Sequence, residues 1–357
     1  MIKSCYIHIP FCKNICSYCD FCKMYYNKDF IDKYLLSLEK EINLYYKNDL
    51  LNTLYIGGGT PSCLDEISLK KLFKIISIFK LNKTYEFTFE CNIEDINEKL
   101  LIFLKENKVN RISIGLQSFN KKYIEFMNRK YLNKKEITDK INLVKKYFNN
   151  INIDLIYGIN NETLKELQEE VDSFINLDVN HISLYSLILE DNTILKTKKY
   201  KEIDDDLNRK MYDYIRKTLK KNNYIHYEIS NFSKKGYMSK HNLCYWNNDN
   251  YYGFGLGSSG FVDNIRYTNT RSLNSYINGN YRYIKEKIDK KRNMEYEMIL
   301  NLRKIKGISK KNFYKKYNIN IKDVFDVSKL NENKYYFYIP KKYLFVENYI
   351  LCDFILD

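Results

Sequence analysis

The sequence predicts an α/β fold, a partial (β/α)6 barrel followed by a small C-terminal α+β domain. Up to about residue 230, six short β-branched or aromatic runs alternate with longer helical patterns. Distinctive polar or small residues follow the ends of these runs, and beyond residue 230 the chain changes to loops rich in Gly and Tyr. Repeated alternation of strand and helix indicates a parallel sheet.

Each strand is predicted from a run of residues that suit a buried pleated surface, and each helix from apolar residues recurring at helical spacing. The predicted strands are Cys5–Ile9, Thr53–Ile56, Tyr85–Glu90, Arg111–Gly115, Ile151–Tyr157 and His181–Leu187. The predicted helices between them are Phe30–Tyr46, Ile67–Phe79, Ile96–Glu106, Lys134–Tyr147 and Leu164–Ile175.

The predicted domain boundaries follow the change in composition. We expect the barrel in residues 1–230, a Gly- and Tyr-rich segment in 231–290 and the small α+β domain in 291–357. The last part begins with a charged helical segment, Glu295–Lys304. Near its end, Tyr335–Ile339 and Tyr343–Val346 flank Pro340-Lys341-Lys342, which predicts a hairpin.

Composition narrows the class of protein. No apolar run reaches the roughly 18 residues of a membrane span, and we expect no signal segment at Met1-Ile2-Lys3. The chain has nine cysteines, and most of those outside one loop are isolated in the sequence. We therefore expect a soluble cytoplasmic protein in a reducing compartment. The formal charge of +15 comes from lysines spread along the chain rather than gathered in a patch, which argues against a nucleic-acid partner.

Three cysteines near the start, Cys12, Cys16 and Cys19, have the spacing C-x3-C-x2-C. Thiolates are the usual ligands of iron–sulfur clusters, and three of them would leave one iron of a cubane open. The alternatives are free structural thiols, a zinc loop, or a ferredoxin-like run that also uses Cys22. Zinc sites favour a second short pair, and the four cysteines do not match the ferredoxin spacing.

Further distinctive residues follow the other predicted strands. Since ligands bind at the carboxyl ends of parallel strands, these residues are expected at one rim. They are Gly57–Thr60 after the second strand, Glu90 at the end of the third, Gln117 after the fourth, Asp154 to Gly158 closing the fifth, and Tyr185 and Glu190 near the end of the sixth. A single polar strand end is commonly a local cap. Six strand ends, counting the cysteine loop after the first strand, together favour a site.

Several motifs in order resemble those of the radical S-adenosylmethionine superfamily. They are Tyr6-Ile-His8-Ile-Pro-Phe-Cys12, Cys19-Asp20-Phe21, Tyr55-Ile-Gly57-Gly58-Gly59-Thr60-Pro61-Ser62, Arg111-Ile-Ser113-Ile-Gly115-Leu-Gln117-Ser118-Phe119 and Asp154-Leu-Ile-Tyr157-Gly158. The resemblance is to the branch that contains oxygen-independent coproporphyrinogen III oxidase and the heme chaperone HemW. It implies a [4Fe-4S] cluster on Cys12, Cys16 and Cys19, with S-adenosylmethionine on the fourth iron.

The same resemblance implies the residues that contact S-adenosylmethionine. Tyr6, Glu90, Gln117, Arg129 and Asp154 match such positions, and Gly58, Gly59 and Thr60 match the loop beside the methionine moiety. The ligand needs acceptors for its amine and hydroxyls and a cation for its carboxylate, which two carboxylates, an amide and an arginine supply. A plain tight turn is the other interpretation of the glycines.

The segment His241-Asn242-Leu243-Cys244-Tyr245-Trp246 resembles the HNxxYW signature of the HemW family, which is implicated in heme binding. His can ligate heme iron, and Tyr and Trp offer flat apolar surface. From physics alone, a buried, hydrogen-bonded His241 is the simpler interpretation, but the resemblance implies that His241 binds heme. The family's usual Ala-His is Ser258-Ser259 here, and its Leu-Gly-Arg-x-His segment is Met127-Asn128-Arg129-Lys130-Tyr131.

The resemblance therefore implies a heme chaperone that passes heme to an acceptor protein and needs a flavodoxin- or ferredoxin-like reductant. The alternative is the oxidase, a radical decarboxylase of porphyrin biosynthesis, which has a fourth cysteine where this chain has Phe21 and an N-terminal extension before its cluster. A radical enzyme acting on RNA is a third hypothesis, motivated only by charge.

Overall fold

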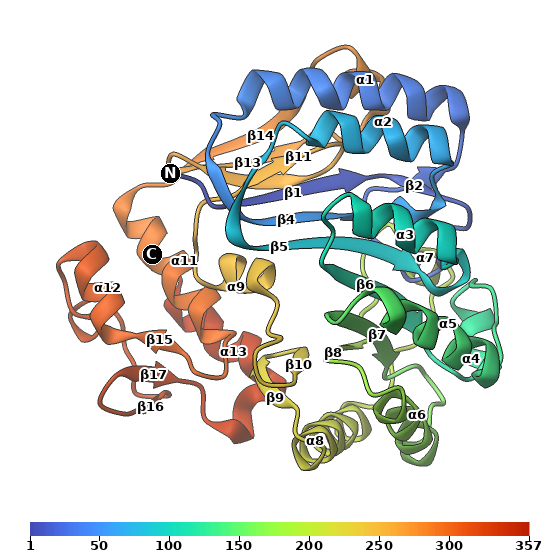
Figure 1. The fold of residues 1–357 in the computed structure, drawn as a ribbon. Coiled ribbons are helices and arrows are strands. Elements are labelled where there is room, and N and C mark those ends of the chain that lie inside the picture. The colour runs from blue at the N-terminus through green and yellow to red at the C-terminus, as the bar shows by residue number, and fades with distance from the viewer. Residues whose placement is uncertain (357) are drawn as a thin grey trace.

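A nine-stranded sheet organises the computed structural model, which describes residues 1–356 (Figure 1). The strand order is β11-β1-β4-β5-β6-β7-β8-β10-β9, so the sheet is open, with β11 and β9 at its edges. The six central strands run parallel in chain order, which confirms the predicted partial barrel. They are β1 (Ser4–Ile9), β4 (Leu50–Gly58), β5 (Lys80–Asn92), β6 (Arg111–Gln117), β7 (Ile151–Tyr157) and β8 (His181–Ser186).

Helices connect these strands, and Figure 1 shows α1, α2 and α3 along the outer side of the sheet. Their first turns are fixed by side-chain caps: Asn133 and Thr163 form capping boxes with Glu136 and Glu166. The connecting helices are α1 (Lys28–Tyr45), α2 (Glu66–Ile76), α3 (Glu98–Glu106), α4 (Lys121–Phe126), α5 (Lys134–Tyr147), α6 (Leu164–Asn176), α7 (Ile194–Thr197) and α8 (Asp205–Lys221), with 3-10 turns at Pro61–Cys63 and Ile93–Asp95.

Residues beyond 230 add a strand near each edge of the sheet. β11 (Tyr252–Phe254) pairs in parallel with β1, while β10 (Asn231–Ser233) pairs antiparallel with β8 and with β9 (Ile225–Glu228). α9 (Lys240–Trp246) follows β10 and precedes β11 along the chain. It lies across β4 and β5 on the side away from α1 and α2 (Figure 1). The domain boundary at residue 230 stays a prediction, but strands from before and after that residue belong to the same sheet.

The segment predicted as Gly- and Tyr-rich loops also forms a small antiparallel sheet. Its elements are β12 (Ser259–Val262), β13 (Ile265–Asn269), α10 (Leu273–Ile277) and β14 (Arg282–Lys287). This sheet was not expected from the sequence, because its pairings are set by contacts with α1 and β11. Buried Glu41 of α1 accepts hydrogen bonds from Gly255 N, Asn269 Nδ2 and Tyr276 OH.

The C-terminal residues form a small mixed α+β unit, as predicted. It contains α11 (Lys290–Leu302), β15 (Ile308–Ser309), α12 (Lys310–Tyr317), β16 (Asn331–Glu332), β17 (Tyr336–Tyr338) and α13 (Glu347–Leu351), with 3-10 turns at Ile321–Asp323, Lys341–Val346 and Cys352–Phe354. Asp357, the last residue of the predicted domain, lies outside the described residues.

The predicted hairpin is wrong. β17 pairs with β15 and β16 instead, while Lys341–Val346 forms a 3-10 helix. Pro340 opens this helix, where its fixed φ suits a turn, and its carbonyl accepts a hydrogen bond from Tyr343 N at 2.8 Å. The helical turn buries Leu344 against the core, which a solvent-facing second strand would not do.

No helix within residues 1–356 combines the length and apolar character needed to cross a membrane.

Candidate cluster and cofactor site

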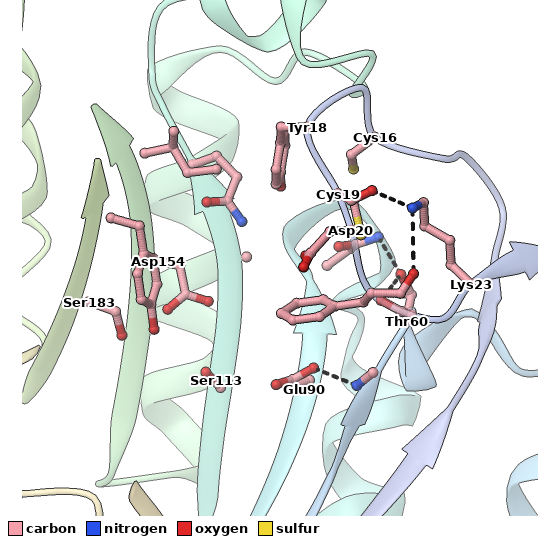
Figure 2. Close-up of a pocket in the computed structure, with 18 of the residues that line it drawn as sticks. Cys16, Tyr18, Cys19, Asp20, Lys23, Thr60, Glu90, Ser113, Asp154 and Ser183 are labelled. Atoms are coloured by element: carbon pink, nitrogen blue, oxygen red, sulfur yellow. Dashed lines mark hydrogen bonds between the residues drawn. The ribbon is translucent and has the colours of Figure 1, made fainter. Parts of the chain in front are cut away.

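A cavity of about 420 Å³ lies at the carboxyl ends of the parallel strands. It brings together nearly all the residues that the sequence assigned to a site. Figure 2 shows Cys16 and Cys19 at one end of this cavity, with Glu90 of β5 and Asp154 of β7 facing it. The predicted residues that line it are Cys12, Cys16, Cys19, Gly58, Gly59, Thr60, Glu90, Gln117, Arg129, Asp154, Tyr185 and Glu190.

The cysteine loop is held at its base by β2 (Phe11–Cys12) and β3 (Met24–Tyr25), which pair in parallel. Cys12 Sγ accepts a hydrogen bond from Thr60 Oγ1 at 3.6 Å, and Cys16 Sγ accepts one from Arg129 Nη1 at 3.8 Å. Polar donors thus already face two of the three sulfurs, an arrangement that suits thiolates.

The three thiols line one cavity without converging on one point. Within residues 1–356, no three His, Cys, Asp or Glu side chains are grouped closely enough to hold one metal ion. A cubane does not require this, because each thiolate binds its own iron. The donor set therefore suits a cluster better than a single zinc ion.

The glycine turn after β4 packs directly on the cysteine loop. A Cβ atom on Gly59 would lie 2.9 Å from Cys12 Sγ and 2.9 Å from the Phe11 carbonyl oxygen, so no larger residue fits. Gly58 has φ of +120°, and its N–H donates to Glu90 Oε2 at 3.0 Å. The glycines therefore serve close approach as well as turning.

A β-bulge aims Gln117 into the cavity. The register of β6 and β7 shifts between Gly115 and Gln117, and Gln117 has φ of +72°, a strained value for a residue with a side chain. Its Oε1 atom is buried and has no hydrogen-bond partner among residues 1–356. A buried acceptor of this kind needs a donor, and a ligand hydroxyl or amine would supply one.

Burial controls the charge of the two carboxyl groups. It raises the pKa of Glu90 to about 7, and it raises the pKa of Asp154 as well. Tyr55 OH donates to Glu90 Oε1 at 2.6 Å and opposes the rise, as does the buried Arg111, whose charge also lowers the pKa of Asp154. A cationic ligand group in the cavity would lower both pKa values and favour the carboxylate forms.

Arg129 supplies the cationic side chain beside the cysteines. Its Nη2 donates to Gly115 O at 2.8 Å and to Asn92 Oδ1 at 3.1 Å, and it lies 3.7 Å from Glu94 Oε2. The guanidinium is 7% exposed, so a ligand carboxylate would meet a fixed and weakly solvated charge.

Two predicted residues lie outside this cavity. Tyr6 lines a different one, and its hydroxyl is hydrogen-bonded to His8 Nδ1 at 3.0 Å. His241 is 1% exposed, with Nδ1 bonded to Thr53 Oγ1 at 2.8 Å and Nε2 to Tyr245 OH at 2.7 Å. Burial lowers the pKa of His241 to about 3, so its ring is neutral and both nitrogens are already occupied.

The sequence prediction missed several polar residues on the inner face of the strands. Asn152 Nδ2 donates to Asp154 Oδ1 at 2.9 Å and to Ser113 Oγ at 2.8 Å, and Ser183 lies on the next strand. These residues alternate with buried apolar ones, as Asn152 and Asp154 do along β7. That period-two pattern of polar side chains in strands otherwise rich in Ile was the available signal.

Comparison with known proteins agrees with this geometry. The Radical SAM superfamily model matches residues 6–174. The heme chaperone HemW of Lactococcus lactis is 38% identical over 332 residues, covering 90% of this chain and 87% of its own length. The heme chaperone HemW of Bacillus subtilis is 38% identical over 339 residues, covering 91% of this chain and 89% of its own.

A solved structure shares the fold at much lower identity. Coproporphyrinogen III oxidase (HemN) from Escherichia coli superimposes with a TM-score of 0.85 at 19% identity, over 99% of this chain and 90% of that one. Superfamily membership implies a [4Fe-4S] cluster and S-adenosylmethionine. The chain belongs to the heme chaperone HemW family of the radical S-adenosylmethionine superfamily.

Proposed function

We propose that this protein is a heme chaperone of the HemW type, which binds heme, a [4Fe-4S] cluster and exchangeable S-adenosylmethionine, and passes heme to an acceptor protein. The observation that carries the proposal is one cavity lined by the three loop cysteines and by the two carboxyl groups, the amide and the arginine expected to bind S-adenosylmethionine. The names of relatives that align along most of the chain support heme as the cargo.

In this proposal Cys12, Cys16 and Cys19 hold the cluster, and the remaining cavity residues hold S-adenosylmethionine. Arg129 pairs with the carboxylate of the ligand, Glu90 and Asp154 accept from its amine and hydroxyls, and Gln117 Oε1 gains the donor that it lacks. When bound, the reduced cluster and S-adenosylmethionine supply reductive cleavage of a carbon–sulfur bond. The side chains of the cavity orient the ligand and limit the access of water.

Reduction of the cluster requires a low-potential donor, for which a flavodoxin- or ferredoxin-like protein is proposed. All nine cysteines are free thiols. Thiols that stay unpaired are usual in a reducing compartment, which supports the cytoplasm as the location.

Oxygen-independent coproporphyrinogen III oxidase is the second candidate, favoured by the shared fold. The decisive assay incubates the reduced, cluster-loaded protein with S-adenosylmethionine and coproporphyrinogen III. In a parallel sample, heme-loaded protein is mixed with apomyoglobin as a heme-accepting probe. A chaperone transfers heme to the probe and yields no protoporphyrinogen IX, whereas formation of that product would assign the oxidase activity.

The charge state of Glu90 should control the affinity for S-adenosylmethionine. Because the pKa of Glu90 is raised to about 7, the folded protein keeps this proton between about pH 4.5 and 7, whereas the unfolded chain releases it. Rising pH in that window therefore destabilises the fold through Glu90, but it also creates the anion that pairs with the ligand amine. We expect affinity to rise about tenfold between roughly pH 6 and pH 8.

Isothermal titration with Glu90→Gln tests this expectation, since the variant should bind weakly and without that pH dependence. Glu170→Gln is the matched control, because burial also raises the pKa of Glu170 to about 7 but its carboxylate accepts from Phe119 N outside the cavity. An unchanged pH profile in Glu90→Gln would remove Glu90 from the site.

A further inference from the structure

A second cavity, of about 360 Å³, shares the cysteine loop with the cofactor cavity. Asp20 and Phe21 line both cavities, so this short stretch of the loop forms a common wall. The other side of the second cavity is formed by the turn at Gly257 to Ser259 and by Tyr245 of α9. The HNxxYW segment therefore meets this cavity through Tyr245.

Aromatic side chains supply much of the lining. Tyr6, Tyr245 and Tyr251 contribute to it, and the rings of Tyr245 and Tyr251 lie 4.7 Å apart in an edge-to-face arrangement. Phe21 at the common wall is 62% exposed, a large fraction for this residue type. Such surfaces suit a flat apolar ligand.

Two guanidinium groups also line the cavity, and within residues 1–356 neither forms an ion pair. Arg266 lies between the rings of Phe261 and Tyr296, at 4.3 and 4.1 Å, and its buried Nε has no hydrogen-bond partner. Arg271 donates to the backbone oxygen of Asp20 at 2.7 Å. The carboxyl groups among the lining residues are those of Asp20 and of the exposed Asp249, and neither is paired with an arginine. Fixed cations without counter-charges suit a ligand that carries carboxylates.

Histidine is poorly placed to ligate a metal in this cavity. Only His8 of the four histidines lines it, and both of its ring nitrogens have partners: Tyr6 OH at 3.0 Å and the Cys22 carbonyl oxygen at 2.7 Å. His241 is buried behind Tyr245 with both nitrogens engaged. A metal-bearing ligand must therefore find a different donor.

Cys22 provides that donor. It is the cysteine among the lining residues, and the Arg271 guanidinium interacts with its thiol. A Cβ atom on Gly257 would lie 2.5 Å from Cys22 Cβ and 3.0 Å from Cys22 Sγ. Glycine at that position, which has φ of +69°, therefore lets the turn pack directly against the Cys22 side chain, which holds the sulfur in place at the cavity wall.

We propose that heme binds in this second cavity, with Cys22 Sγ as a ligand of the heme iron and with Arg266 and Arg271 paired to the propionates. The inference rests on the proposed heme-chaperone function and specifies its site. On binding, a sulfur–iron bond forms and the thiol proton passes to solvent, while the oxidation state of the iron does not change. The common wall of Asp20 and Phe21 then places the heme next to the cluster loop.

The test is a titration of ferric heme into the full chain with its cluster reconstituted, so that Cys12, Cys16 and Cys19 are occupied. Absorption spectra are recorded, and the complex is then reduced under carbon monoxide, because thiolate-ligated heme gives a strongly red-shifted Soret band. The wild type should show this band, and Cys22→Ser should lose it while still binding heme. Cys352→Ser, which changes an exposed cysteine in the C-terminal unit, is the matched control and should keep it.

Arg266→Gln and Arg271→Gln should each weaken heme binding about tenfold with the thiolate band retained, the usual effect of losing one charge-assisted contact. Arg209→Gln on α8 is the control for charge alone. A wild-type complex with a histidine-type spectrum would overturn the cavity assignment whether or not Cys22→Ser folds, and so would a thiolate band that persists in Cys22→Ser. Either result leaves the chaperone function intact, whereas failure of the wild type to bind heme at all would overturn both.

Discussion

Alanine at Cys12, Cys16 or Cys19 is expected to abolish the iron–sulfur cluster in each single variant. After anaerobic reconstitution, the wild type should hold about four irons per chain, as a cubane requires. The three loop thiols line one cavity, and two of them face the donors Thr60 and Arg129, so each single variant removes one of the three thiolate ligands assigned to the cluster. Iron and sulfide analysis with visible absorption measures the outcome.

Cys22→Ala is the matched control for these three variants, because Cys22 belongs to the same loop but lines the second cavity rather than the first. It should retain the full iron content. Loss of the cluster in Cys22→Ala alone, or its survival in Cys16→Ala, would contradict the ligand assignment.

His241→Ala should destabilise the fold by about 3 kcal/mol, because it removes a fully buried ring and two hydrogen bonds. The ring lies 5.0 Å from that of Tyr55, whose hydroxyl holds Glu90, and it anchors Tyr245. α9 is also fixed at its start, where Glu86 accepts from the N–H groups of Lys240 and His241. We therefore expect weaker heme binding as an indirect effect, because Tyr245 would no longer be held in place by the His241 ring.

Thermal denaturation and heme absorption spectra separate this positioning role from ligation. The spectrum of bound heme should be the same in His241→Ala and in the wild type, even where affinity falls. His241→Gln, which can keep one hydrogen bond, should recover part of the stability. A variant with unchanged stability but an altered heme spectrum would make His241 an iron ligand after all.

The parallel strands were predictable because each is a local run of apolar residues long enough to identify itself. β7 and α5 begin and end at the predicted residues. The small sheet β12–β14 and the 3-10 turn at Lys341–Val346 were not, since their form depends on distant partners such as Glu41 and β15. Short segments carry too little pattern to specify such pairings.

The same distinction holds for the site, where local features were predictable and contacts between distant segments were not. Cys12, Cys16 and Cys19 are recognisable because their spacing is local, and Glu90 and Asp154 because strand ends share a rim. The burial of His241 depends on α9 folding back over β4 and β5. There Thr53 is hydrogen-bonded to the His241 ring, and Glu86 accepts from the His241 N–H. Likewise, Cys22 lies beside Arg271 only because the chain after β11 returns to the cysteine loop.

Heme titration of the full-length, cluster-loaded protein tests the central claim most directly. Trp246, the single tryptophan, lies in α9 next to Tyr245, so its fluorescence reports on heme bound in the second cavity. We expect its emission to be quenched to saturation at one heme per chain, in step with growth of the Soret band. Quenching that rises without saturation, or no Soret change, would contradict the account of this protein as a heme chaperone.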